Sequence, residues 1–203
     1  MPQKKSKPKR IRLDPGERRG QLLEIASRLV LKHGFLPLSL VELSRAAGVS
    51  KGLIYTYFPT QHALFNALLL GRLQELNAAG LERASRQRKL EDAAKECADI
   101  YFSHVAASGP LIHFILRDRY MAGHIDQEVR RIRNSIVRHL SRLGGKRLRL
   151  NAKEAIAAFN LILTIPEEAG RLVFDGSLSL ERGRSLCQRL LASTLVSIAP
   201  VPK

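Results

Sequence analysis

The residues of this sequence best suited to chemistry are hydroxyl-bearing and basic side chains in its first third. Ser50, Lys51 and Gly52 open a short stretch of apolar spacing, and Tyr55 and Tyr57 follow within two helical turns. Ser is a favoured helix N-cap, Lys brings a cation, and Gly lets another backbone approach closely. A helix start with these groups binds phosphate well. The group therefore indicates contact with a nucleic-acid backbone, and the tyrosines add hydroxyls and flat surfaces for backbone or thymine.

The sequence shows no catalytic or metal-binding motif that would suggest another function for these residues. The sequence has no Gly-rich phosphate loop, no nucleophile elbow, and no histidines clustered with carboxylates at metal-ligand spacing. Cys97 and Cys187 are too few and too far apart for a zinc site or a disulfide scaffold. We therefore expect no enzyme, no metal and no cofactor.

The charge of the chain favours a polyanionic partner. The 203 residues carry a formal net charge of +16, and residues 1–65 hold 12 Lys and Arg against 4 Asp and Glu. About a third of the chain thus carries half of the excess, which points to nucleic acid. No apolar run approaches the roughly 18 residues of a membrane span, and no apolar segment follows the basic N-terminus as in a signal peptide. We expect a cytoplasmic protein with no membrane partner.

The elements that would position these residues are short helices. Apolar spacing predicts a helix from about residue 17 that ends at Gly34. Ser39 with Glu42 three residues later has the layout of a capping box, so a second helix begins there. Gly48 suits a left-handed turn, and Ser50 opens a third helix that Pro59 ends. Two short helices joined by such a turn, over residues 39–58, have the dimensions of a helix-turn-helix.

Helical spacing continues to the end of the sequence. No strand-like alternation of useful length interrupts it, so the predicted fold class is all-α. Pro166 should kink or split one helix, and Gly144-Gly145 should end another. The polar stretch 82–89 is the best candidate for a domain boundary. The predicted helices cover residues 61–76, 90–105, 111–116, 125–143, 152–174 and 179–198.

The stretch from Leu22 to Leu69 resembles the DNA-binding domain of the tetracycline-repressor (TetR) family, most closely in the phrase AGVSKGLIYTYF. The basic composition of the N-terminus predicts a disordered arm at residues 1–15, which is either a solubilising tail or an arm that touches phosphates or a minor groove. The resemblance implies a three-helix DNA-binding domain at 16–76 and a larger helical ligand-binding and dimerisation domain at 77–203. It implies that Leu40, Leu43, Ala47, Val49 and Phe58 form the small core. The implied DNA-binding residues are Ser39, Arg45, Ser50, Lys51, Gly52, Tyr55, Tyr57 and Gln61.

One position departs from the family pattern. A lysine usually follows the Phe closely, opens the fourth helix and holds a phosphate, whereas this chain has Gln61 followed by His62. Gln61 can still donate a hydrogen bond but brings no charge. Arg45, Lys51 or the basic arm would then compensate.

For the C-terminal half the resemblance implies a homodimer that binds a small molecule. The interface candidates are Ala155, Phe159, Leu186, Leu190 and Leu195, and packing within one protomer is the alternative. The ligand-pocket candidates are Tyr101, His104, His113, Phe114, Arg117, Phe159 and Asn160. The alternative for the histidines is an ordinary core position, and for Arg117 a surface pair with Asp118. For Glu167, Glu168 and Arg171 a solvated face is favoured over a pocket wall.

The function expected from these observations is a sequence-specific regulator of transcription. A homodimer would bind double-stranded operator DNA with two-fold symmetry, its recognition helices roughly 34–36 Å apart. The commonest mode of the family is a repressor that a small-molecule effector releases from a palindromic operator. Such a protein would be associated with the nucleoid when bound to DNA. The alternative is a nonspecific nucleic-acid-binding or architectural protein.

Overall fold

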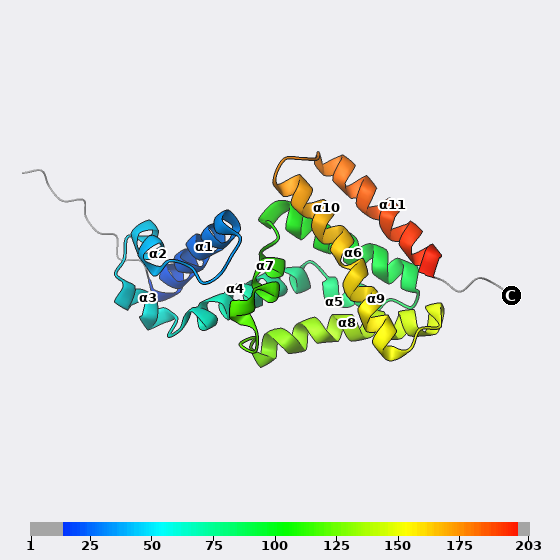
Figure 1. The fold of residues 1–203 in the computed structure, drawn as a ribbon, viewed down its shortest axis with the longest axis horizontal. Helices are drawn as coiled ribbons and strands as arrows, with labels where there is room; N and C mark the ends of the chain where they lie inside the picture. The colour runs from blue at the N-terminus through cyan, green and yellow to red at the C-terminus, as the bar shows by residue number, and fades with distance from the viewer. Residues whose placement is uncertain (1–13, 199–203) are drawn as a thin grey trace, which may run out of the picture.

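The computed structural model describes residues 14–198, and every regular element in that range is a helix (Figure 1). The predicted fold class is therefore confirmed. The basic residues 1–13 of the predicted arm lie outside the described residues. The elements are α1 (Pro15–His33), α2 (Leu40–Ala47), α3 (Lys51–Tyr57), α4 (Gln61–Ala78), α5 (Leu81–Ser85), α6 (Leu90–Ser108), α7 (Leu111–Arg117), a short 3₁₀ helix η1 (Arg119–Met121), α8 (Gln127–Leu148), α9 (Ala152–Ile162), α10 (Thr164–Phe174) and α11 (Leu180–Ile198).

Local capping explains where the first three helices begin and end. Asp14 and Glu17 form a capping box at the start of α1, and Gly34, with φ 73°, ends that helix. Ser39 accepts a hydrogen bond from the Glu42 N–H at 3.3 Å and so caps α2. Gly48, with φ 64°, ends α2 in the left-handed region where Gly is favoured. The predicted helix-turn-helix is thus present, with a tight turn between α2 and α3.

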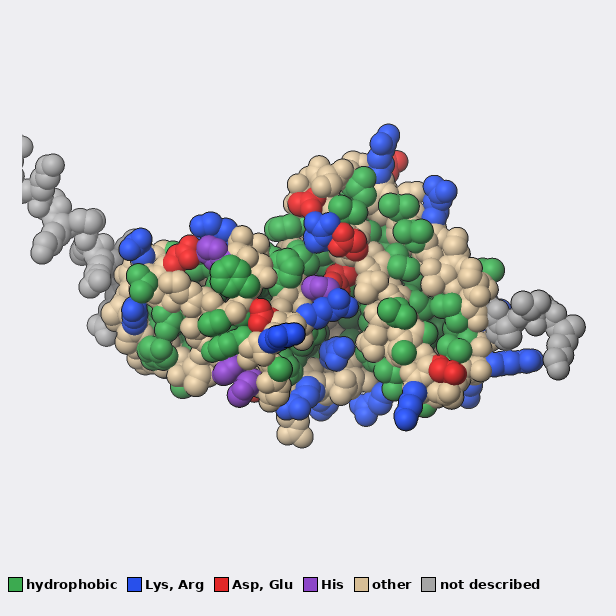
Figure 2. Space-filling model, in the orientation of Figure 1, with side chains coloured by type: hydrophobic (Ala, Val, Ile, Leu, Met, Phe, Trp, Pro, Cys, Tyr) green, Lys and Arg blue, Asp and Glu red, His purple; other side chains and the backbone are tan. Residues whose placement is uncertain are grey.

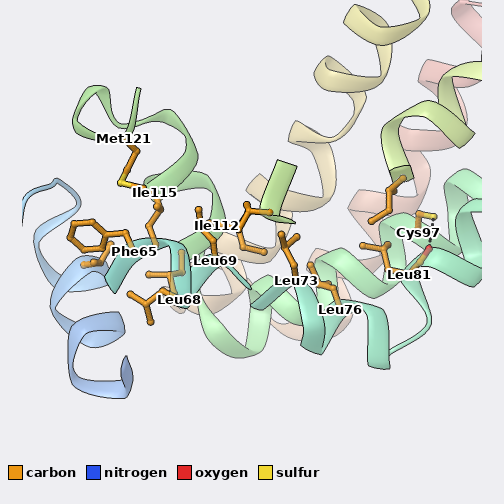
Figure 3. Packing of buried hydrophobic residues seen from close by; sticks show 14 of the residues in the cluster. Phe65, Leu68, Leu69, Leu73, Leu76, Leu81, Cys97, Ile112, Ile115 and Met121 are labelled. Carbon is orange, nitrogen blue, oxygen red and sulfur yellow. Dashed lines mark hydrogen bonds between the residues drawn. The ribbon is translucent and has the colours of Figure 1, made fainter. Parts of the chain in front are cut away.

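Helix α4 runs from the small N-terminal bundle into the larger C-terminal one (Figure 1). Figure 3 shows its buried side chains, from Phe65 to Leu76, in a row that meets Ile112 and Ile115 of α7. Phe65 and Leu69 have no exposed surface, so α4 is held by core packing along most of its length. One apolar cluster therefore joins both bundles.

The C-terminal bundle differs from the sequence prediction at its glycines. Helix α8 continues through Gly144 and Gly145 and ends at Leu148. A Cβ atom on Gly144 would overlap the ring of Phe159, so this glycine allows α8 and α9 to approach closely. The prediction that the glycine pair ends the helix was wrong because tertiary packing outweighs the weak helix propensity of Gly.

Two other predicted features have clear outcomes in this bundle. The helix that contains Pro166 is split: α9 ends at Ile162, and α10 begins at Thr164 with Pro166 in its first turn. Within the polar stretch 82–89, Ala84 and Ser85 are buried as part of α5.

No helix among residues 14–198 is long and apolar enough to cross a membrane.

Candidate nucleic-acid interface and ligand cavity

Helix α3 is the element with the clearest division between a packed face and a free one. Ile54 is 1% exposed and the adjoining Phe58 3%, so both belong to the core. Lys51 and Gly52 are exposed at the start of the helix, and Tyr55 keeps 47% of its surface exposed. Tyr57 is half-buried and packs against the core cluster. The free face thus presents a cation, open backbone and a phenol.

The two capping serines have a role inside the fold as well as at the surface. Ser50 accepts a hydrogen bond from the Leu53 N–H at 3.2 Å, and Ser39 caps α2 in the same way. Each hydroxyl keeps its own O–H for a further acceptor, such as a phosphate oxygen. Arg45, in the last turn of α2, is exposed beside the turn. All three residues are exposed, Ser39 at the start of α2, and Arg45 and Ser50 on either side of the turn that follows it.

Gln61 makes contacts that the sequence did not indicate. Its amide oxygen accepts from the Leu38 N–H at 2.9 Å, and its amide nitrogen donates to the Leu38 carbonyl at 3.1 Å. The side chain thus fixes the segment before α2. Thr60 caps α4 by accepting from Ala63, which leaves the N–H groups of Gln61 and His62 without an intrahelical partner. A phosphate contact at this helix start would therefore use the backbone.

Next to that helix start, α4 is tied to the segment 118–126. The His62 ring stacks between those of Tyr120 and His124, at centroid distances of 4.3 and 3.9 Å. The buried Asn66 donates to the His124 carbonyl at 2.8 Å and accepts from the Asp126 N–H at 2.9 Å. Asp126 is the N-cap residue of α8, so one side chain connects α4 with the start of α8.

The same segment also holds the loop between α1 and α2. The carboxylate of Asp118 accepts from the Leu36 N–H at 2.9 Å, across 82 residues of sequence. Its other oxygen accepts from the Tyr120 N–H at 2.8 Å and so caps η1. Residues 118–126 therefore contact the N-terminal bundle at two places, one before the helix-turn-helix in the sequence and one after it.

A cavity of about 450 Å³ opens between α7, α8 and α10. It is of the size that small-molecule sites have. Four of the predicted ligand residues line it together: Tyr101, His113, Arg117 and Asn160. Figure 2 shows basic, acidic and histidine side chains gathered near the middle of the face that it draws.

The other three predicted ligand residues lie elsewhere. His104 stands 3.8 Å from a carboxylate oxygen of Glu75, and burial lowers its pKa. Phe159 is 2% exposed and packs against Gly144. Phe114 is half-buried against the main core cluster. None of the three is among the residues that line the cavity.

Glu167 lines the cavity, which corrects the expectation of a solvated face. The Tyr101 hydroxyl donates to its carboxylate at 3.3 Å, and His113 pairs with its other oxygen. Burial raises the pKa of Glu167 and lowers the pKa of His113, so burial favours the neutral form of each group. Glu168 is exposed and pairs with Arg171, which is half-buried, so the expectation of a solvated face suits this pair better.

Comparison with known proteins identifies the fold and the helix-turn-helix together. Residues 22–68 match the family model described as bacterial regulatory proteins, tetR family. The whole fold is similar to the crystal structure of a TetR-like transcriptional regulator from Rhodococcus sp. RHA1, with a TM-score of 0.66, 17% identity and coverage of 91% of this chain and 99% of that one. Residues 22–68 thus match the DNA-binding domain of the TetR family, and the chain as a whole shares the fold of TetR-like regulators.

Curated transcriptional regulators match over only part of their own length. The transcriptional activator FasR of Mycolicibacterium smegmatis is 36% identical over 75 residues, which is 37% of this chain and 34% of that protein. The transcriptional repressor KstR2 of Rhodococcus jostii is 25% identical over 111 residues, which is 51% of this chain and 54% of that protein. The match thus spans about half the length of one relative and a third of the other.

Two residues that line the cavity were not predicted from the sequence. Arg130 and Arg133 line the cavity from α8, one turn apart. The signal available was their position beside Val129 and Ile136, which face the core. In an arginine-rich helix that signal does not separate cavity-lining residues from solvated ones.

The predicted dimer residues divide by exposure. Leu186 and Leu190 on α11 are 40% and 48% exposed. Ala155, Phe159 and Leu195 are buried within the chain itself, at 1%, 2% and 8%. The first two side chains are therefore accessible to another molecule, whereas the last three belong to the core of the chain.

Proposed function

We propose that the chain is a sequence-specific DNA-binding regulator of transcription. The observation that carries the proposal is the free face of α3, where Lys51, Gly52 and Tyr55 are exposed over a buried apolar face. A helix packed on one side and polar on the other, next to a capped turn, has the geometry that enters a major groove. The basic excess of the N-terminal third supports the same partner.

We propose further that the protein acts as a homodimer on a palindromic operator. Leu186 and Leu190 leave an apolar strip on the exposed side of α11. Exposed apolar strips of this kind mark protein interfaces when they are contiguous. A two-fold dimer through this strip would carry two copies of α3 and so match two half-sites.

The effect of a ligand would pass from the cavity to α4. Helices α7 and α8 form its walls, and the segment between them holds Leu36, His62 and Asn66 of the DNA-binding end. A ligand that favours one spacing of α7 and α8 would shift the population of DNA-binding orientations. We propose that this releases a repressor, the commonest arrangement in the family.

Selection of bound sequences from a random duplex pool tests the DNA-binding proposal. The full chain should enrich a palindrome whose half-site centres are about 10–10.5 base pairs apart, or a multiple of that spacing. Enrichment of single, unpaired half-sites would contradict the dimer. No enrichment at all would favour the alternative of a nonspecific or architectural binder.

A further inference from the structure

We infer that the cavity between α7 and α8 binds an aliphatic molecule with an anionic head group. The head would lie against Arg117, Arg130 and Arg133. The inference rests on the proposed ligand-responsive function and names the chemical class of the effector. Three properties of the lining carry it: an aliphatic body, a surplus of unpaired cations, and a carboxylate that is already satisfied.

The body of the cavity is aliphatic. Leucine, isoleucine and valine side chains from α4, α7 and α8 form most of its wall, among them Leu73, Leu76, Ile112, Val129, Ile136 and Leu140. Tyr101 and His113 supply the only rings among the described residues that line it. A flat aromatic ligand would find few rings to stack on, whereas a hydrocarbon chain would be in contact on all sides.

Three arginines of the lining come from α7 and α8. Arg117 ends α7, and Arg130 and Arg133 project from the first half of α8. None of the three forms an ion pair within residues 14–198, although Arg72, Arg171 and other arginines of this range do. The guanidinium group binds carboxylate and phosphate through paired N–H donors, so three arginines without an ion pair in the lining of one cavity suit an anion.

The single carboxylate of the lining does not cancel these charges. Glu167 accepts from Tyr101 and pairs with His113, so its oxygens are engaged. Arg117 and Arg133 line the same cavity as Tyr101, whose pKa is raised by burial and by Glu167. A head group at that point would meet two guanidinium groups and the neutral hydroxyl of Tyr101.

Two sources share this chemistry: a fatty acid with a free carboxylate, and its thioester with a phosphorylated carrier. Binding to the full chain without DNA, measured by calorimetry below the micelle concentration of each probe, tests the class. The probes are dodecanoate, dodecanoyl coenzyme A, dodecanol and dodecyltrimethylammonium. At least one of the anions should bind tenfold or more tightly than the alcohol, and the cation should bind most weakly.

The tighter of the two anions identifies the source. Shortening its chain by two methylenes should weaken binding about 15-fold, because each buried methylene contributes roughly fourfold. Equal binding of dodecanol and both anions would overturn the inference, and so would tighter binding of the cation.

Variants on α7 and α8 locate the head group. The double variant Arg117→Gln, Arg133→Gln should lose most of the preference for the anion over dodecanol. Arg131→Gln is the matched control, because Arg131 is exposed on α8 but does not line the cavity. All of these side chains are exposed, so thermal unfolding should be unchanged. An undiminished preference in the double variant, or an equal loss in the control, would overturn the assignment.

Operator binding separates this inference from the proposed function. If the anion binds through the arginines but leaves operator affinity unchanged, the ligand class stands and the proposed release fails. If an uncharged aliphatic compound releases the operator and the anions do not, the regulatory function stands and the ligand class is overturned.

Discussion

Single residues around the helix-turn-helix differ in whether the fold already uses them. Ser39, Ser50 and Gln61 each bond to backbone groups of their own chain. Lys51 and Tyr55 make no such bond in the described structure and are exposed. Substitution of the first three would therefore change folding and DNA binding together. Lys51 and Tyr55 are the positions where an effect on DNA can be separated from an effect on stability.

Lys51→Ala should weaken operator binding without lowering the thermal midpoint. Loss of one phosphate contact should reduce the slope of log affinity against log salt by about 1. Lys153→Ala, an exposed position at the start of α9, should leave the slope unchanged. Normal binding of the Lys51 variant across the whole salt range would remove Lys51 from the interface.

The residues that sequence could assign are those whose partners are near in the chain. The caps at Ser39 and Ser50 act over three residues and were predicted. The contact of Gln61 with Leu38 spans 23 residues, and that of Tyr101 with Glu167 spans 66. Such contacts depend on the tertiary fold, which the local spacing of residues does not reveal. The contacts of Gln61 and Glu167 could therefore be identified only from the structure.

At the scale of elements, Asn66 is the polar connection between α4 and α8. Asn66→Ala would leave the His124 carbonyl and the Asp126 N–H without their partner, at a cost of about 1–3 kcal/mol in unfolding free energy. It should also reduce the effect of ligand on operator affinity, measured as the ratio of operator dissociation constants with and without saturating ligand.

Asn77→Ala on the same helix is the control for this variant. The side-chain oxygen of Asn77 is buried without a hydrogen-bond partner in the described structure, so its removal should cost little. A ligand response as large in the Asn66 variant as in the unaltered chain would show that coupling takes another route.

The contact of α8 with α9 depends on Gly144. Gly144→Ala should lower the unfolding free energy by about 1–3 kcal/mol, because the new methyl group must displace the ring of Phe159. Gly71→Ala in α4 meets nothing within 4 Å and should be neutral or stabilising by up to about 1 kcal/mol. Chemical denaturation of both variants measures their free energies of unfolding. An equal free energy of unfolding for the two variants would contradict the close packing of α8 on α9.

The sequence alone predicted that the glycine pair ends a helix, because the ring that packs against Gly144 belongs to another helix.

At the scale of the whole molecule, the proposed function requires two copies of the chain. Leu186→Glu with Leu190→Glu should convert a dimer to a monomer in sedimentation experiments, because both side chains are exposed on α11. The affinity for the operator should fall in the same variant, since a monomer binds only one half-site. Val41→Glu, an exposed apolar position on α2, should remain dimeric. A dimer that survives the double substitution would place the interface elsewhere.

Sequence-specific recognition by α3 is tested most directly by one equilibrium titration. The full chain would be titrated with its selected operator and with a shuffled duplex of the same composition, at about 0.15 M salt. Specific readout predicts a ratio of affinities of roughly 10³ or more. Equal affinity for the two duplexes would contradict it, and would leave a basic helical protein that binds DNA without regard to sequence.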